Sequence, residues 1–259
     1  MTPQHDPRRL PIALLTYAVW ALVTVFGMRW ASDGSKKPLI KGVTHGISWN
    51  LLMAVAVLAV ATAVMGWRDL KFVAPRPRLS LGILWFPALY LAVFALLPAL
   101  LGLPPAGTLL FIAINTALVG LSEEWMFRGV LFQGLRSRLA LWPAMLLTSA
   151  LFGAVHVLNV FVTGQLLEAA VQAVAAFLSG LLLMALLVRT GSIWVPIAYH
   201  ALWDFGTFVA SSTRPADAAP ADFAQGWTWA LPMLVVLPNA LFGLFLLRKV
   251  RNHTRLSTD

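Results

Sequence analysis

Long apolar segments follow one another along most of the chain, and they constrain its fold more than any other feature. A helix that crosses the hydrocarbon core of a membrane needs about 20 consecutive, mostly apolar residues. We expect such helices at residues 10–30, 47–67, 79–101, 107–135, 141–159, 167–189, 191–211 and 227–247. The sequence therefore predicts an all-α, polytopic membrane protein with about eight transmembrane helices, in which residues 1–259 form a single integral membrane domain.

The composition supports a membrane protein and argues against other classes. Charged residues make up 11% of the chain, whereas an ordinary soluble domain has about 25%. The net charge of +9 could indicate a nucleic-acid partner, but the basic residues lie in short connections between apolar segments, where they suit anionic lipid headgroups. We therefore expect the lipid bilayer as a partner and no nucleic acid. The absence of cysteine excludes disulfides, thiolate metal ligands and a cysteine nucleophile.

The basic residues also predict the orientation of the chain. Lysine and arginine are more frequent in the N-terminal segment and in every second connection than in the intervening connections. Because these residues are enriched on the cytoplasmic side of membrane proteins, we expect both termini in the cytoplasm. The sequence carries no signal for a eukaryotic compartment, which favours the inner (plasma) membrane of a bacterium.

Ionisable residues inside the expected spans are the first indication of function. They are Glu123, Glu124, Arg128, His156, His200 and Asp204. An ionisable side chain at the bilayer centre costs about 2.5–3.5 kcal/mol on insertion scales, and such residues usually face the protein interior or a wet cavity. These residues lie in the predicted segments 107–135, 141–159 and 191–211. We therefore expect these three segments to bring the side chains together. With the boundaries given above, the side chains lie at different depths, so the fourth or fifth segment must be shifted, tilted or broken for them to meet.

The spacing of the two glutamates separates a structural from a chemical role. Glu124 and Arg128 are four residues apart, with the acid first, which is the better order for an ion pair on a helix. Glu123 is rotated by about 100° from Glu124 around the helix axis, so it stays free for chemistry. A structural role is enough to explain the Glu124–Arg128 pair. It does not explain why a second glutamate lies next to Glu124.

The histidines lie in the two other segments. His200 and Asp204 are four residues apart, as are Phe152 and His156, and residues at this spacing share one face of a helix. Taken alone, His156 fits a buried core histidine, and His200 with Asp204 fits a polar pair between packed helices. The joint occurrence of both histidines with two adjacent glutamates favours a functional site.

Three motifs in this order resemble the signature of a known family. They are Glu123-Glu124-x-x-x-Arg128, Phe152-x-x-x-His156 and His200-x-x-x-Asp204. Their order and their placement in apolar segments are similar to those of the CPBP (CAAX protease and bacteriocin-processing, or Abi) intramembrane proteases, which include the type II CAAX prenyl proteases. The resemblance covers approximately residues 107–211, and eight spans suit the fold that it implies.

The resemblance implies an intramembrane endopeptidase that hydrolyses a peptide bond of a membrane-associated peptide or protein. In such an enzyme Glu123 would be the general base that activates water, and His156 would help to hold that water. Glu124 and Arg128 would position their helix and tune Glu123. His200 would stabilise the oxyanion of the tetrahedral intermediate.

Asp204 stands where many members of this family have asparagine. An ionised aspartate cannot donate a hydrogen bond to an oxyanion. Asp204 is therefore either protonated in its apolar surroundings, or it orients and charges His200, which then donates alone. The spacing of four residues between the two side chains favours the second interpretation.

A zinc metalloprotease is the alternative mechanism, with Glu123, His156 and His200 as the metal ligands. The sequence lacks the His-Glu-x-x-His arrangement that places two zinc ligands one helical turn apart. We therefore expect a glutamate mechanism without a metal or another cofactor.

Two other classes of function use polar clusters in a membrane. A non-catalytic scaffold or partner protein could keep the cluster for helix assembly, although that role needs only Glu124 with Arg128. A proton-coupled transporter could use it as a proton relay, although the sequence lacks the internal repeats that are typical of transporters. For a protease, the substrate class stays open among peptide pheromones, bacteriocin leaders and the tails of sorted membrane proteins, and a bacterial location argues against prenylated CAAX substrates.

Overall fold

The computed structural model describes residues 6–31, 36, 38–76, 81–213 and 227–251. Within these ranges the chain folds into helices joined by short connections, and no strand occurs. The all-α class predicted from the apolar segments is therefore confirmed for the described residues.

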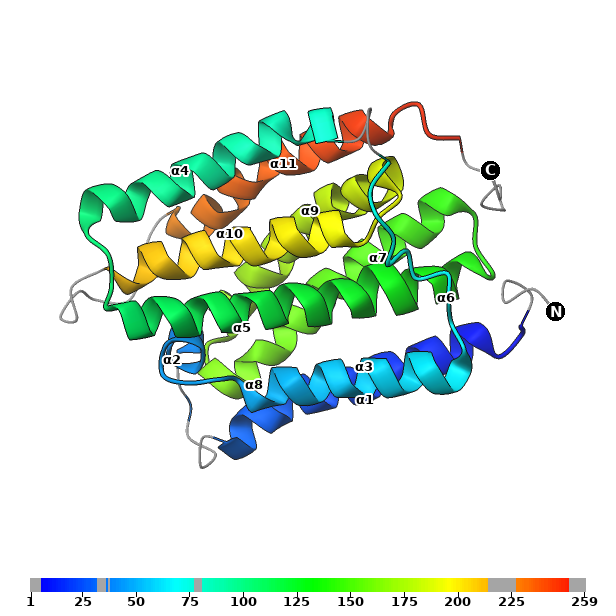
Figure 1. Cartoon of the computed structure of the whole chain (residues 1–259), viewed down its shortest axis with the longest axis horizontal. Helices are drawn as coiled ribbons and strands as arrows, with labels where there is room; N and C mark the ends of the chain where they lie inside the picture. The colour runs from blue at the N-terminus through cyan, green and yellow to red at the C-terminus, as the bar shows by residue number, and fades with distance from the viewer. Residues whose placement is uncertain (1–5, 32–35, 37, 77–80, 214–226, 252–259) are drawn as a thin grey trace.

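The helices follow the order of the apolar segments (Figure 1). Their bounds are α1 Arg9–Ala31, α2 Leu39–Thr44, α3 Trp49–Met65, α4 Trp85–Leu101, α5 Ala106–Glu124, α6 Phe132–Arg136, α7 Leu141–His156, α8 Val160–Thr163, α9 Leu166–Thr190, α10 Trp194–Ser212 and α11 Leu231–Leu247. Short helical turns complete them: η2 Leu81–Leu84, η3 Trp125–Leu131, η4 Val157–Asn159 and η5 Thr228–Ala230. The short helix α2 lies in a connection between two predicted spans, where the apolar pattern predicts no helix.

Five helical stretches in the described ranges are long and apolar enough to cross a membrane. They are Arg9–Gly27, Ala106–Arg136, Leu141–Thr163, Leu166–Thr190 and Thr228–Leu247. Two further apolar stretches, Trp49–Met65 and Gly82–Leu96, are shorter. Many large apolar side chains on the outside of the bundle are exposed, among them Leu15, Val64 and Leu100, and an aqueous surface rarely carries so many. The chain is therefore a polytopic, helical membrane protein.

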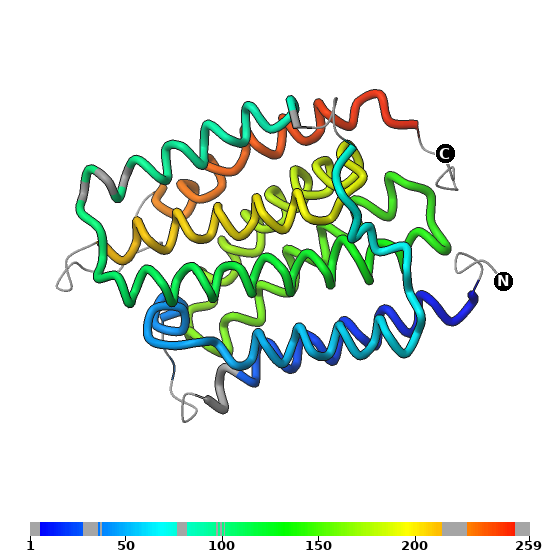
Figure 2. Tube along the Cα trace, in the orientation of Figure 1, coloured from blue at the N-terminus to red at the C-terminus, as the bar shows by residue number. Residues whose placement is uncertain are grey.

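The helices pack side by side in one bundle (Figures 1 and 2). Helix α9 packs against α7 and α11, α10 packs against α5 and α4, and α3 packs against α1 and α5. The first turn of α1 and the last turns of α11 lie at the same end of the bundle, whereas α2 lies at the opposite end. Helix α1 thus begins, and helix α11 ends, on one side of the bundle.

Two glycines allow the helices that carry the ionisable residues to approach one another closely. A Cβ atom at Gly120 would lie 2.8 Å from the carbonyl oxygen of Ile197, where α5 meets α10. A Cβ atom at Gly153 would lie 2.6 Å from the carbonyl oxygen of Ala173, where α7 meets α9. Any larger side chain would force these helices apart, because real Cβ atoms do not come so close to a backbone oxygen. Glycine at these positions therefore sets the separation of the helices around the site.

Candidate active site

The ionisable residues lie next to irregular turns in two of the helices. Helix α5 ends at Glu124 and continues as η3, seven residues with the wider hydrogen-bonding pattern of a π-helix. Helix α7 ends at His156 and continues as the tight turn η4. π-helical turns change the phase of a helix and are frequent at functional sites. The fourth and fifth predicted segments are therefore both irregular where their polar residues have to meet.

Glu124 lies at the centre of a buried chain of polar contacts. Its Oε1 accepts one hydrogen bond from Arg128 Nη1 at 3.1 Å and another from His200 Nδ1 at 2.8 Å. Arg128 also donates through Nη2 to the carbonyl oxygen of Gly180 at 3.3 Å, and its guanidinium lies 4.3 Å from the centre of the Phe152 ring. Glu124 and Arg128 are both 0% exposed. The ion pair predicted from the spacing is present, and it extends to His200 on another helix.

This contact determines which nitrogen of His200 faces the other carboxylates. Because the Glu124 carboxylate can only accept, Nδ1 donates the hydrogen bond, and Nε2 points the other way. Nε2 lies 3.6 Å from Asp204 Oδ2 and 3.8 Å from Glu123 Oε2. These are distances of ion pairs and are too long for good hydrogen bonds. Three carboxylates thus surround one imidazole ring.

The interpretation that Asp204 orients His200 needs a correction. The hydrogen bond that orients the ring comes from Glu124 on α5. Asp204, one turn further along α10, lies on the Nε2 side of the ring and contributes a nearby charge. Spacing along one helix could not predict this, because the orienting carboxylate belongs to a different helix.

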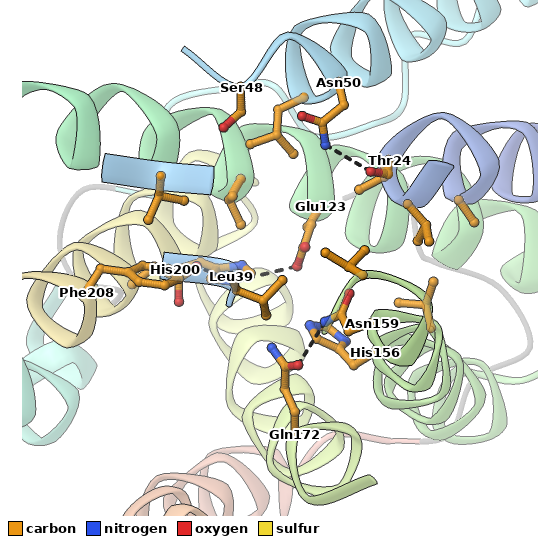
Figure 3. Close-up of a pocket in the computed structure, with 18 of the residues that line it drawn as sticks. Thr24, Leu39, Ser48, Asn50, Glu123, His156, Asn159, Gln172, His200 and Phe208 are labelled. Carbon is orange, nitrogen blue, oxygen red and sulfur yellow. Dashed lines mark hydrogen bonds and ion pairs between the residues drawn. The ribbon is translucent and has the colours of Figure 1, made fainter. Parts of the chain in front are cut away.

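Glu123 lies beside this chain of contacts and is not paired with Arg128. Its side chain is 13% exposed, and it points into a cavity between His200 and His156 (Figure 3). Within the described part of the chain, its Oε2 has no hydrogen-bond partner. A carboxylate with unused acceptor capacity beside a cavity can accept a hydrogen bond from a water molecule.

His156 is held by the helix that carries it. Its Nδ1 lies 2.7 Å from the carbonyl oxygen of Phe152, and because a carbonyl oxygen only accepts, Nδ1 carries the hydrogen. The His156 and Phe152 rings lie edge to face, with their centres 5.1 Å apart, as their spacing predicts. In the neutral ring Nε2 is then the free acceptor, and His156 lines the same cavity as Glu123.

The cavity that contains Glu123 has a volume of about 280 Å³. Each water molecule in the liquid occupies about 30 Å³, so the cavity has room for several waters or for part of a peptide. Its lining includes Glu123, His156, His200 and Asp204. The structure thus brings four of the six predicted site residues to one cavity. Glu124 and Arg128 lie behind them in the buried chain of contacts.

A second cavity adjoins the first. It has a volume of about 440 Å³ and is enclosed mainly by apolar side chains of α4, α9, α10 and α11. His156, Gln172, His200, Asp204 and Thr207 line both cavities. The cavity that contains the glutamate therefore adjoins an apolar one at these residues.

Five polar residues that complete the first cavity are not among the six predicted site residues. Thr24, Ser48, Asn50, Asn159 and Gln172 line it, and Figure 3 shows them around Glu123 and the histidines. Two of them carry a local signal, since Asn159 follows His156 by about one helical turn at the end of an apolar segment and Gln172 lies in the first turns of the next one. The others come from distant parts of the chain, and their shared position depends on packing.

Asn115 explains how Ser48 and Asn50 reach the cavity. Its Oδ1 accepts a hydrogen bond from the backbone nitrogen of Ser48 at 2.8 Å. Its Nδ2 donates to the carbonyl oxygens of Val43 at 3.0 Å and Gly46 at 2.7 Å. This single buried amide therefore fixes the connection between α2 and α3 against α5.

The candidate zinc ligands do not form a recognisable metal site. Among the described residues, no group of three or more His, Asp or Glu side chains is placed to hold a metal ion. His156 and His200 each have Nδ1 in a hydrogen bond within the protein, which leaves Nε2 of each ring available, as in histidines that bind metals. The choice between the glutamate and the zinc mechanism therefore rests on metal analysis of the active protein.

A bundle of apolar helices that encloses Glu123, His156 and His200 beside a cavity has the features of a membrane-embedded enzyme. Residues 105–206, less than half of the chain, match the family model described as Type II CAAX prenyl endopeptidase Rce1-like. The matched region contains all three motifs and confirms the resemblance to the CPBP intramembrane proteases. No curated protein matches the chain. Helices α1 to α4 and α11 lie outside the matched region.

Proposed function

We propose that the protein is an intramembrane endopeptidase that cleaves a peptide bond with a water molecule activated by Glu123. The observation that carries this proposal is the convergence of Glu123, His156 and His200, from three helices, on one cavity. The match to an endopeptidase family supports the class of reaction.

In the first step of the proposed reaction, Glu123 takes a proton from water while the water oxygen attacks the carbonyl carbon of the scissile bond. His156 Nε2 accepts a hydrogen bond from the same water and fixes its direction. The attack moves charge onto the carbonyl oxygen, and Nε2–H of His200, in its imidazolium form, donates a hydrogen bond to that oxyanion.

In the second step, Glu123 gives the proton to the amide nitrogen, and the carbon–nitrogen bond breaks. The products are a carboxylic acid and an amine, so one water is consumed and Glu123 returns to its starting form. Glu124 keeps Nδ1 of His200 occupied, which leaves Nε2 for the oxyanion, and Arg128 balances the charge of Glu124. Asp204 supports the positive charge of His200 from 3.6 Å.

We also propose that α3, α4 and α10 cross the membrane together with the five longer stretches, which gives about eight spans. These spans would form one integral membrane domain, and the distribution of basic residues favours both termini in the cytoplasm. The lack of a signal for a eukaryotic compartment favours the inner membrane of a bacterium. The proposed substrate is a membrane-associated peptide or protein segment. Although the matched family is named for prenylated CAAX substrates, a bacterial membrane favours pheromone, leader or membrane-protein tail peptides.

Comparing the membrane peptides of cells tests the proposed activity. Cells with the wild-type protein should contain peptide fragments that are missing from cells with the Glu123→Gln variant. The reason is that only the wild-type protein has the carboxylate that activates water. Mass spectrometry of the membrane fraction measures the difference. Glu168→Gln is the matched control, since Glu168 is half-buried and lines neither cavity. Identical fragments in all three strains would favour the scaffold or transporter function.

The roles of His200 and Asp204 can be separated with two variants. His200→Ala should lower the rate of peptide cleavage about a hundredfold, because it removes the oxyanion donor. Asp204→Asn should keep the rate within about tenfold of the wild type, because Glu124 still orients His200. Initial rates with a quenched-fluorescent peptide measure both effects, and an equal, complete loss in the two variants would contradict this assignment.

A further inference from the structure

The amide side chains of Asn159 and Gln172 form a pair beside the proposed catalytic centre. Asn159 Nδ2 donates to Gln172 Oε1 at 2.8 Å, so the pair joins η4 to α9. Both residues are half-buried and line the cavity that contains Glu123 (Figure 3). Gln172 also lines the apolar cavity. The pair therefore lies where the two cavities meet.

The pair has one unused donor group and one unused acceptor group. An amide side chain has an NH₂ donor and a carbonyl acceptor, and the bond between the two residues uses one of each. Among the described residues, neither side chain makes another hydrogen bond, which leaves the Asn159 carbonyl and the Gln172 NH₂ group. If both amides were turned over, their roles would be exchanged and the same combination would remain.

A peptide group has the complementary combination of one carbonyl acceptor and one N–H donor. We propose that Asn159 and Gln172 bind the backbone of the substrate next to the scissile bond, with Gln172 donating to a carbonyl and Asn159 accepting from an N–H. This inference rests on the proposed function. It assigns a substrate-binding role that requires no particular substrate side chain.

The proposed binding mode also specifies the conformation of the substrate. In a helix most backbone N–H and carbonyl groups are already bonded to one another, so a helical segment cannot offer both groups to the pair. An extended or locally unwound segment can. The substrate class is therefore a peptide with an extended stretch at the cleavage site, whether it is a free peptide or the unwound end of a membrane helix.

The position of the pair agrees with such a role. Asn159 follows His156, which is proposed to hold the water, by about one helical turn. Gln172 lies on α9, opposite the end of α7. A backbone fixed there would extend from the cavity with Glu123 toward the apolar cavity, which has room for a large apolar side chain.

Gln172→Glu provides a sharp test, because Glu keeps the size and the acceptor for Asn159 Nδ2 but replaces the NH₂ donor with an oxygen. The probe is a quenched-fluorescent peptide that the wild-type protein cleaves in detergent micelles. We expect KM to rise about tenfold with kcat nearly unchanged, because a hydrogen bond to the bound backbone is lost. Gln165→Glu, an exposed position two turns earlier, should change neither value.

Ester analogues of the same peptide test the partner group. Replacing one peptide bond at a time by an ester removes a backbone N–H, and at one position KM should rise about tenfold in the wild type. The same ester should not raise KM further in the Asn159→Ala variant, because that variant already lacks the acceptor. Thermal unfolding in detergent establishes that each variant is folded.

The outcomes distinguish this inference from the proposed function. An unchanged KM in Gln172→Glu and Asn159→Ala, together with full loss of cleavage in Glu123→Gln, would overturn the backbone-binding role alone. A fall in kcat at constant KM would indicate that the pair acts only in the transition state and not in binding the substrate backbone, and it would also overturn this inference. Continued cleavage by Glu123→Gln would overturn the proposed function instead.

Discussion

Glu123→Gln is expected to lower kcat for peptide cleavage by about a thousandfold, within the range that general-base catalysis contributes. Glutamine has the size of glutamate but cannot accept a proton from water, so the nucleophile is not activated and no group returns a proton to the leaving amine. Because Glu123 is not part of the Glu124–Arg128 ion pair, folding should be preserved. Initial rates with the purified protein in detergent measure the loss, and the thermal unfolding midpoint checks the fold.

Two controls make this result specific. Glu168→Gln, the same substitution outside both cavities, should keep wild-type activity. Metal analysis of the same active preparation, with and without a chelator, tests the zinc mechanism separately. Stoichiometric zinc, with activity that a chelator removes and zinc restores, would replace the metal-free mechanism. A Glu123→Gln protein that cleaves the peptide at the wild-type rate would refute the general-base role.

The course of the helices could be predicted because it depends on hydropathy, which is a local property of the sequence. Each apolar segment corresponds to a helix in the structure, since lipid leaves a backbone no other way to satisfy its hydrogen bonds within one segment. The irregular turns η3 and η4 were not predictable in the same way. Each contains one polar residue, Arg128 in η3 and Asn159 in η4, but a polar residue in an apolar segment gives no signal for a change in helical pitch.

The candidate site was predictable in composition but only partly in geometry. The cost of burying Glu123, His156 and His200 separately predicts that they meet, and they line one cavity. The hydrogen bond from His200 to Glu124 joins α10 to α5, and spacing along a single helix carries no information about such a contact. For the same reason the spacing predicts Asp204 as the residue that orients His200, whereas the structure places Glu124 in the hydrogen bond with that ring.

Breaking the buried ion pair should have the largest effect on stability. In Glu124→Leu, the guanidinium of Arg128 stays in a fully buried position without its carboxylate. Removing one partner of a buried pair typically costs about 3–5 kcal/mol. We therefore expect the thermal unfolding midpoint in detergent to fall by about 10 °C, with loss of cleavage because His200 is no longer oriented.

The double variant Glu124→Leu with Arg128→Met separates stability from chemistry. Replacing both members of a buried pair by apolar side chains of similar size is often neutral, so the unfolding midpoint should return to within a few degrees of the wild type. Cleavage should stay at least about a hundredfold below the wild type, because the hydrogen bond to His200 Nδ1 is still missing. Recovery of both properties would mean that Glu124 serves only to neutralise Arg128, and that His200 obtains its orientation from another group. Recovery of stability alone would show that Glu124 also orients His200. An apolar pair removes the need to neutralise Arg128, but it cannot accept the hydrogen bond that holds the imidazole ring in one direction.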